Sequence, residues 1–413
     1  MSNNQKDSQA VGILGLTSIT VAFTVTLNNF SVSAGIMGNM SFGRGLVAII
    51  LAWICLSIVY ILSGTIGAVT HKNAAEIFTY TFGRQGFRIP SICMSLAMLG
   101  FGIFDFWYCG AAISALISPL PEFGFYLGLA VIVAASIFGI IKDISSLKWL
   151  TSVTIPIAFI LFIVILIVTI YQVGWDTVTS YTPDVELPMV TGVNILFSSF
   201  IACASGFSDI TCHATSKKAV FVAMPLAMFA VALQFFVAQV GYYGYVITDF
   251  VSLVVALGGG IYIVGNIFTI FAQCNTAPSN VLIISTQLNK SIRIPKKALI
   301  VIVPLILAVG SIALHLGADI TIITQFASFL SCMFGPLLGI LAAECHVVRR
   351  LDLSEDVESL AAFCPSGIIS LGLGFAVGIY LTYFAPFSSP VALVLYVGCF
   401  ILQIILRKAC KLR

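Results

Sequence analysis

The sequence predicts an all-α, polytopic membrane protein with twelve transmembrane helices. Three numbers lead to this prediction: of 413 residues, 60% are hydrophobic and only 8% are charged, and the mean hydropathy is +1.10. A soluble domain has about a quarter charged residues, so this chain has too few charges to cover a surface in water. Because one bilayer crossing needs about 20 apolar residues, the length allows about a dozen crossings and no sizeable soluble domain.

Twelve hydrophobic runs in the chain are bounded by charged residues, proline or glycine, as transmembrane helices are. The longest polar segment between them, residues 348–365, is expected to be a solvated cytoplasmic linker. The predicted spans are residues 12–38, 44–69, 90–117, 123–141, 149–172, 189–211, 219–247, 252–286, 298–317, 320–347, 366–385 and 389–407.

Basic residues predict the orientation of these spans. With the N-terminus in the cytoplasm, 18 of the 19 Lys and Arg residues fall on the inner side, and only Arg44 falls outside. Cytoplasmic loops of membrane proteins are enriched in Lys and Arg. We therefore expect a plasma membrane (bacterial inner membrane) protein with two cytoplasmic tails, residues 1–11 and 408–413. The inner basic residues are Lys6, Lys72, Arg84, Arg88, Lys142, Lys148, Lys217, Lys218, Lys290, Arg293, Lys296, Lys297, Arg349, Arg350, Arg407, Lys408, Lys411 and Arg413.

The composition and motifs exclude several other protein classes. A net charge of +3 is too small to indicate a nucleic-acid partner. Most of the 11 cysteines stand singly in apolar runs without metal-ligand spacing, which indicates packing rather than a metal site or a disulfide framework. The sequence contains no phosphate-binding loop and no Ser/His/Asp arrangement, so we expect neither an ATP-driven pump nor an enzyme, and no cofactor.

Polar residues interrupt the first and the sixth span at mid-depth. Asparagines and runs of small residues are poor helix formers, and unwound backbone in a membrane is tolerated only where it lines a cavity or is buried in protein. Interrupted helices at corresponding positions of two halves are typical of a transporter binding site. The interruptions are Thr24, Thr26, Asn28, Asn29, Ser31 and Ser33 in span 1, and Ser198, Ser199, Cys203, Ala204, Ser205 and Gly206 in span 6.

Spans 3 and 8 add polar groups at the same depth. Asp105 is the one acidic residue predicted near the middle of the membrane, where a charge is costly and normally faces a wet cavity. It shares a helix face with Phe101 and Tyr108, whereas Trp107 lies about 200° away around the helix. A substrate or proton role is the leading interpretation of Asp105, and a structural hydrogen bond is the alternative. Span 8 carries Gln273, Asn275, Thr276, Ser279 and Asn280 around Pro278.

Three segments resemble the nucleobase–cation symporter family, which includes cytosine permeases and hydantoin transporters. They are GTIGAVTHKNAAEIFTYTFGRQGFRIPS (64–91), SSFIACASGFSDITCHATSKKAVFVA (198–223) and FASFLSCMFGPLLGILAAECHVVRR (326–350). Their order along the chain matches that of the family. The resemblance implies a five-plus-five inverted repeat of the amino-acid/sodium symporter-like fold, followed by two C-terminal helices. The first repeat would be residues 12–172, the second 189–347, and the last two helices 366–407.

The resemblance also implies a function. The expected activity is secondary active symport, importing a nucleobase or related planar heterocycle (cytosine, hydroxymethylpyrimidine or purine type) with Na⁺ or H⁺. Alternating access would come from rocking spans 1, 2, 6 and 7 against spans 3, 4, 8 and 9. An amino-acid or amine permease of the same inverted-repeat fold is the alternative, and a channel or a sensor is a further one. The expected partners are the small-molecule substrate and the lipid bilayer, and a monomer is expected to function alone.

In this family the heterocycle stacks between an aromatic residue of span 3 and one of span 6. These positions fall on Phe101 and on Phe200, and Ser199, which precedes Phe200, is also expected at the substrate site. The span 3 position that hydantoin transporters fill with Gln falls on Asp105, whose carboxylate favours a ring with amidine-like donors because it accepts two hydrogen bonds. The position where cytosine permeases have Gln falls on Met98, a departure that argues against cytosine itself. The residues expected to read the polar edge of the ring are Asp105, Asn275, Ser279 and Asn280.

The family's sodium site uses main-chain carbonyls of span 1 and hydroxyls of span 8. Thr26 and Asn29 resemble the span 1 positions. Ala272, Asn275 and Thr276 resemble the span 8 pattern of a small residue followed by two hydroxyl residues. Asn275 replaces one hydroxyl, but its amide oxygen is also a hard ligand. Na⁺ is therefore the expected coupling ion, with H⁺ bound by the span 3 carboxylate as the alternative.

Overall fold

The structure of the chain is a computed structural model. It describes residues 11–117, 119–141, 144–292, 294–317, 322–384 and 390–409, without the side chains of Phe23 and of residues 141–154. Every regular element in these ranges is helical, apart from one β-bridge between Val11 and Ala214. The predicted tails, except for their innermost residues, lie outside the described residues.

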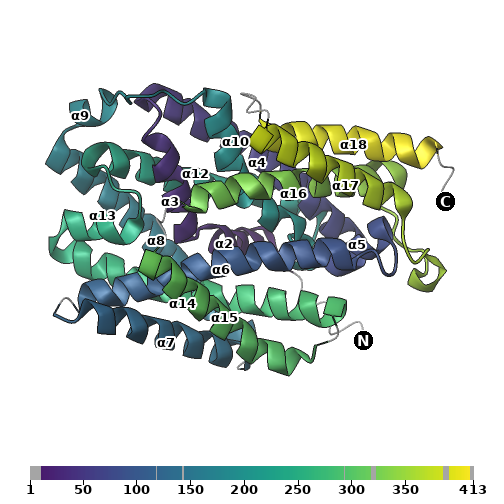
Figure 1. Cartoon of the computed structure of the whole chain (residues 1–413), viewed down its shortest axis with the longest axis horizontal. Helices are drawn as coiled ribbons and strands as arrows, with labels where there is room; N and C mark the ends of the chain where they lie inside the picture. The colour runs from purple at the N-terminus through teal and green to yellow at the C-terminus, as the bar shows by residue number, and fades with distance from the viewer. Residues whose placement is uncertain are drawn as a thin grey trace.

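Ten helices of the described chain are long and apolar enough to cross a membrane. The two other predicted spans, 1 and 6, have different forms. Span 1 is a pair of helices, Ile13–Ala22 and Leu27–Met37, that meet at an angle of 65°. Span 6 contains a shorter apolar helix, Met189–Ser205. The protein is therefore an all-α, multi-pass membrane protein, as predicted (Figure 1).

The helices of the first half are α2 (Ile13–Thr24), α3 (Leu27–Met37), α4 (Phe42–Thr70), α5 (Ala74–Phe82), α6 (Arg88–Leu116), α7 (Pro121–Ile141), α8 (Ile144–Val173) and α9 (Trp175–Thr179). Those of the second half are α10 (Met189–Ser205), α11 (Ser208–Thr211), α12 (Lys217–Tyr245), α13 (Phe250–Leu257), α14 (Gly259–Ile292), α15 (Lys296–Gly317) and α16 (Ile322–Ala342), which continues as the π-helix η1 (Ala343–Val348). A 3₁₀ turn, η2 (Val357–Ser359), precedes α17 (Pro365–Ile379), which continues as the π-helix η3 (Tyr380–Phe384) and is followed by α18 (Val391–Ala409).

The predicted interruption of span 1 is present, whereas α10 runs unbroken through Ser198, Ser199, Cys203, Ala204 and Ser205, so that of the residues predicted to interrupt span 6 only Gly206 lies outside a helix. Thr26, between α2 and α3, is extended (φ −109°, ψ 145°), and its N–H bonds to the Thr24 carbonyl at 2.9 Å instead of continuing the helix. The Asn29 side chain donates to the Thr26 hydroxyl at 2.6 Å, so the polar residues of this stretch bond to one another where the new helix begins. Gly206 lies between α10 and α11, and a Cβ atom there would be 2.0 Å from the Cε atom of Met94 on α6. The second interruption therefore lies against the middle of the molecule.

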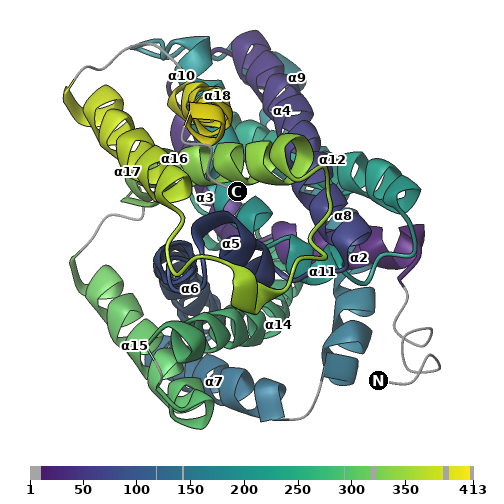
Figure 2. The same ribbon diagram turned by 90° about the vertical axis from the view of Figure 1, so that its right-hand side faces the viewer.

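Two groups of helices face each other across this centre. α12 packs against α2, α3 and α4, and α10 and α11 pack against α4; we call these six helices the bundle. α6 packs against α7, α14 and α15, and we call these four helices the scaffold. The C-terminal helices α16, α17 and α18 form a third group beside α10 (Figures 1 and 2). Both broken spans thus belong to the bundle, and Asp105 belongs to the scaffold.

The prediction of span 8 at residues 252–286 is wrong at its start. That part of the chain forms a separate short helix, α13, before α14 begins at Gly259. Gly258 and Gly259 have φ angles of +68° and +55°. Glycine adopts these left-handed conformations without the steric penalty of other residues, so the pair turns the chain sharply between two apolar helices.

The segment 348–365, predicted to be a solvated linker, packs against the turn between α5 and α6. The N–H groups of Arg84 and Gln85 donate to the carbonyls of Ala361 and Ala362 at 3.0 and 2.7 Å. Figure 2 shows the segment crossing in front of α5, a short helix that was not predicted. These main-chain hydrogen bonds explain why a charged segment is held against the protein instead of extending into water.

A buried ion network fixes the C-terminal end of α18. Glu344 is fully buried in η1, at the C-terminal end of span 10, where Arg407 donates to it through Nη2 at 2.6 Å and Nε at 2.9 Å. Gln403 of the same helix donates at 2.9 Å, and Arg349 at 3.1 Å. Because a buried carboxylate is stable only with such partners, this network ties α18 to span 10.

Gly67 of α4 provides a test of how closely the bundle packs. A Cβ atom there would be 2.3 Å from the Thr211 hydroxyl oxygen and 2.9 Å from the Ser208 Cα atom of α11. Gly67→Ala is expected to destabilise the protein by about 1–3 kcal/mol through overpacking. The measurement is the midpoint of thermal unfolding in detergent. Gly43→Ala in the same helix is the control, because nothing lies within 4 Å of its Cβ position, and an equal decrease in both variants would contradict the close contact.

Candidate functional site

The Asp105 carboxylate lies at the centre of the molecule, between bundle and scaffold, and is fully buried. Its Oδ1 atom accepts a hydrogen bond from Asn28 Nδ2 of α3 at 2.7 Å. Its Oδ2 atom accepts one from Asn280 Nδ2 of α14, also at 2.7 Å. A buried carboxylate without such donors would be strongly unfavourable. Both oxygens are therefore held by neutral amide groups, one from the bundle and one from the scaffold.

Two further contacts join α3 to α6 around this carboxylate. Asn28 Nδ2 also donates to the Phe101 carbonyl at 3.2 Å. One turn from Asp105, the hydroxyl groups of Ser31 and Tyr108 are hydrogen-bonded to each other. These bonds depend on the break in span 1, because α3 begins one residue before Asn28. The sequence interruption therefore aims polar side chains at Asp105.

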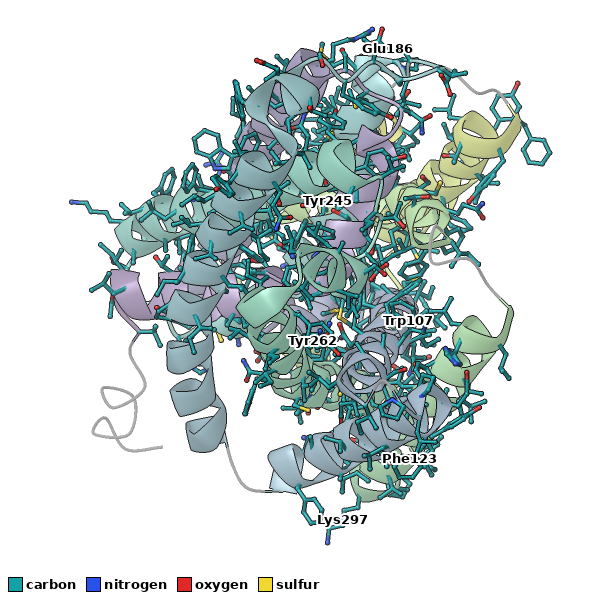
Figure 3. All side chains as sticks on the ribbon, turned by 90° about the vertical axis from the view of Figure 1, so that its left-hand side faces the viewer. Trp107, Phe123, Glu186, Tyr245, Tyr262 and Lys297 are labelled. Atoms are coloured by element: carbon teal, nitrogen blue, oxygen red, sulfur yellow. The ribbon has the colours of Figure 1, made fainter. Side chains whose placement is uncertain are left out.

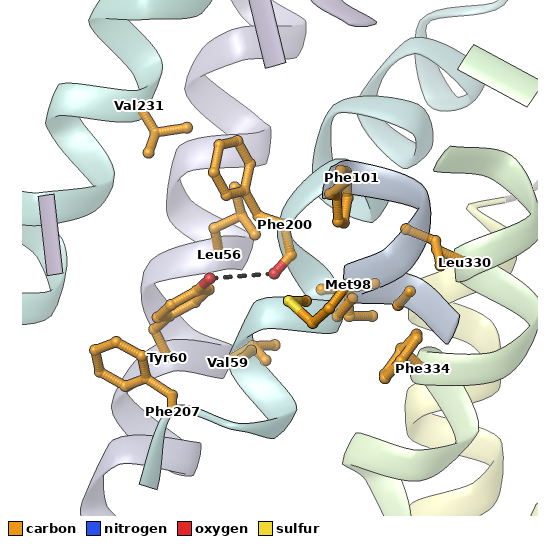
Figure 4. Close-up of a cluster of buried hydrophobic side chains, with 14 of the residues drawn as sticks. Leu56, Val59, Tyr60, Met98, Phe101, Phe200, Phe207, Val231, Leu330 and Phe334 are labelled. Carbon is orange, nitrogen blue, oxygen red and sulfur yellow. Dashed lines mark hydrogen bonds between the residues drawn. The ribbon is translucent and has the colours of Figure 1, made fainter. Parts of the chain in front are cut away.

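The two predicted stacking residues lie in the apolar cluster on the same interface (Figure 4). Phe101 is 6% exposed, and its ring meets that of Phe326 of α16 edge-on, with centroids 5.3 Å apart. Phe200 is 1% exposed and packs edge-to-face against Phe235 of α12 at 5.8 Å. Phe101 belongs to the scaffold and Phe200 to the bundle, so the interface that holds the carboxylate also carries aromatic rings from both sides.

The remaining predicted substrate residues are placed differently. Asn275 is buried and points into a small cavity near the break in span 1 rather than bonding to the carboxylate. Ser199 donates its hydroxyl to the Leu196 carbonyl of its own helix at 2.8 Å. Ser279 is half-buried. Of the residues predicted in span 8, Asn280 is thus the one that is hydrogen-bonded to the Asp105 carboxylate among the described contacts.

The small cavity lies between α2, α8, α12 and α14. Its volume is about 20 Å³, close to the 10–15 Å³ that one water molecule needs. Apolar side chains form most of its wall, and Asn275 and Thr276 are its polar residues. The lining residues are Val21, Ala22, Val25, Ile155, Ala158, Phe159, Phe162, Ala230, Phe268, Ala272, Asn275 and Thr276.

The helix break releases two main-chain carbonyls at this cavity. In a continuous helix Thr26 N–H would bond to the Ala22 carbonyl, but here it bonds to Thr24. Likewise Asn29 N–H bonds to the Thr26 carbonyl at 3.2 Å and not to that of Val25. Ala22 and Val25 both line the cavity, together with the polar residues Asn275 and Thr276 of α14. Carbonyl, amide and hydroxyl oxygens are the ligands that a hard cation prefers.

Comparison with known proteins identifies the family. A family model described as a permease for cytosine/purines, uracil, thiamine and allantoin matches residues 6–359. The chain belongs to this permease family. It is therefore a transporter and not an enzyme. A search of curated protein sequences finds no match.

Solved structures show the same fold as this permease. Mhp1, described as a nucleobase-cation-symport-1 family transporter, in a closed conformation with bromovinylhydantoin bound, is 17% identical and has a TM-score of 0.78; the match covers 97% of this chain and 92% of that one. The inward-facing conformation of Mhp1 is 18% identical, with a TM-score of 0.77 and coverage of 97% and 91%. A Na⁺-coupled sialic acid symporter in a substrate-bound, outward-open state is 14% identical, with a TM-score of 0.66 and coverage of 98% and 91%. The predicted all-α membrane fold of the symporter-like type is confirmed, but the predicted count of twelve transmembrane helices is not.

Two features of the permease differ from the sequence-based expectation. Thr26 and Asn29, expected at the ion site, are not among the cavity-lining residues; their side chains bond to each other. The span 1 wall is formed by Val21, Ala22 and Val25. In addition, Asn28 was not expected at the carboxylate, although the pair of adjacent asparagines in span 1 was a visible signal.

Asn280→Leu tests whether the amide donors stabilise the permease. The substitution leaves one oxygen of a buried carboxylate without its donor, which is expected to cost about 1–3 kcal/mol. Asn266→Leu in the same helix is the matched control. Asn266 is also buried, but its amide bonds only to the Tyr262 carbonyl one turn away and its Oδ1 atom has no described partner. Thermal unfolding in detergent should show a decrease for the first variant only, and equal midpoints would contradict a stabilising role.

Proposed function

We propose that the protein is a secondary active symporter that imports a nucleobase or related planar heterocycle together with a cation, by alternating access. The observation that carries this proposal is the buried Asp105 carboxylate, held by Asn28 of the bundle and Asn280 of the scaffold. A ligand bound there touches both moving parts at once, as the alternating-access mechanism requires. The protein would act as a monomer in the plasma membrane (bacterial inner membrane), with both termini in the cytoplasm.

The polar groups favour a ring that carries adjacent N–H donors. A carboxylate accepts two hydrogen bonds from an amidine-like edge, in place of the amides of Asn28 and Asn280. Asn28 Oδ1 is buried and has no described hydrogen-bond partner, so it offers a further acceptor beside the carboxylate. An unpaired buried acceptor costs about 1–3 kcal/mol, which a ligand donor would recover. Phe101 and Phe200 would contact the faces of the ring.

The coupling cation would occupy the cavity between α2 and α14. The oxygens available are the carbonyls of Ala22 and Val25 on the bundle side and the side chains of Asn275 and Thr276 on the scaffold side. All four are neutral and hard, a donor set that suits Na⁺. A cation bound between them would favour the arrangement that brings the two walls together, which links its binding to the position of the bundle. Proton transfer to Asp105 is the alternative coupling.

The role of Asp105 in recognition can be tested with Asp105→Asn. The variant removes a charged acceptor, and each hydrogen bond to a charged group is worth about 1.5–3 kcal/mol, so binding should weaken at least tenfold. Uptake into proteoliposomes would be measured for radiolabelled cytosine, adenine, uracil and hydantoin, with unlabelled amino acids as competitors. Asp176→Asn makes the same chemical change at an exposed outer position and is expected to leave uptake intact. Unaltered uptake by Asp105→Asn would remove this residue from the site.

Thr276→Val tests the cation site without knowledge of the transported ring. In the wild-type protein NaCl, compared with choline chloride, is expected to raise the midpoint of thermal unfolding in a saturable way. Loss of one oxygen ligand should shift the half-saturating Na⁺ concentration about tenfold, equivalent to about 1.4 kcal/mol. Thr269→Val is the matched control, because Thr269, like Thr276, donates to the carbonyl four residues earlier in α14 but does not line the cavity. A wild-type protein that responds to pH but not to Na⁺ would favour proton coupling.

A further inference from the structure

A second hollow, separate from the central site, opens at the outer end of the scaffold. Its volume is about 420 Å³, and α6, α7, α13 and α15 all contribute to its wall. Trp107 lines it, on a face of α6 about 200° away from that of Asp105. Figure 3 views this end of the molecule and labels Trp107. The helix α6 therefore stands between the two sites.

The wall of this outer hollow combines aromatic rings with one buried carboxylate. The indole N–H of Trp107 has no described hydrogen-bond partner, and the His315 imidazole stacks on Phe125 with centroids 3.8 Å apart. Asp249 is 8% exposed, and its Oδ1 atom accepts the Ser252 N–H at 2.8 Å. Burial raises the pKa of the Asp249 carboxyl, because the charged form has lost water and gains only hydrogen bonds from the start of α13.

The described wall of the outer hollow has an acidic side chain but no strongly basic one. No Lys or Arg is among its lining residues in the described chain. At its edge, Glu122 lies 3.3 Å from the His315 ring and adds a second carboxylate. A cation near the indole face of Trp107 would be attracted by the ring, and its charge would compensate Asp249. Ligand pockets typically have volumes of about 300–1,000 Å³, so a molecule of one or two rings fits this space.

We propose that the outer hollow is a second binding site, for a small aromatic cation with an amidinium or ammonium group. The cationic group pairs with Asp249, and the ring lies against Trp107 and the stacked His315. This site does not depend on the identity of the transported substrate.

Binding there would restrain the movement of the transporter. Asp249 is followed by Phe250, whose ring packs edge-on against Phe30 of α3 at 5.5 Å and against Phe268 of α14 at 6.3 Å. α13 therefore contacts the bundle and the scaffold together. A ligand that holds Asp249 in place also holds Phe250 between the two groups of helices, so it should slow transport without occupying the central site.

The experiment uses the purified full-length protein in detergent with benzamidine as the cation and benzamide as its uncharged analogue. Benzamidine is expected to raise the midpoint of thermal unfolding in a saturable way, and benzamide is not. Asp249→Asn should weaken the benzamidine response at least tenfold, and it keeps the start of α13 intact because Asn caps helices as well as Asp. The amidine group of benzamidine also suits the Asp105 carboxylate of the central site, so the measurement is repeated in Asp105→Asn, where a saturable response that depends on Asp249 should persist.

Three results would overturn the proposal: equal shifts with benzamide, a full response in Asp249→Asn, or a response lost in Asp105→Asn. The last would show that the cation binds at the central site. If Asp249→Asn does not yield folded protein, Trp107→Leu replaces it, because that substitution removes the ring and keeps an apolar side chain. A benzamidine affinity in Trp107→Leu equal to that of the wild type would equally overturn the proposal.

Discussion

A carboxylate in the middle of a bilayer must find hydrogen-bond donors within the protein, and the organisation of this permease follows from that requirement. Asp105 obtains one donor from each side of the interface on which the helices would have to move. The donor on the bundle side exists only because span 1 stops and restarts just before Asn28. An unbroken span would place this side chain elsewhere around the helix. The helix break in the first span is therefore needed for the hydrogen bond between Asn28 and Asp105.

The same break connects the centre to the small cavity on the other side of span 1. Val25, which lines that cavity, and Asn28, whose amide holds Asp105, lie three positions apart in the chain. Gln234 of α12 donates to the intervening Thr26 carbonyl at 2.6 Å, which keeps this stretch attached to the bundle. Cation binding in the cavity that displaces residues 25–28 would also displace the Asn28 amide that bonds to Asp105. The proposed coupling between cation and substrate thus has a short physical route along the main chain.

The parts of the fold that sequence analysis predicted are those with a strong compositional signal. Long apolar runs predict the transmembrane spans. Asp105 stands out as a candidate site residue because it is an acidic residue predicted near the middle of such a run. Other features depend on geometry that side-chain patterns do not contain. The register of α3 decides that Asn28, and not its neighbour, points at the carboxylate. Main-chain carbonyls such as that of Ala22 carry no residue-type signal. The helices α13 and α14 are both apolar, so only the run of glycines at 258–260 marks the turn between them.

The released carbonyls of Ala22 and Val25 have a consequence for how such a protein diversifies. Main-chain atoms are present whatever residue occupies a position, so point mutations cannot delete this half of the cavity wall as long as the break persists. Inherited variation in ion preference would then be concentrated on the opposite wall, at Asn275 and Thr276. Among homologues that retain the interrupted first span, these two positions are where different ionic requirements should leave their evolutionary record.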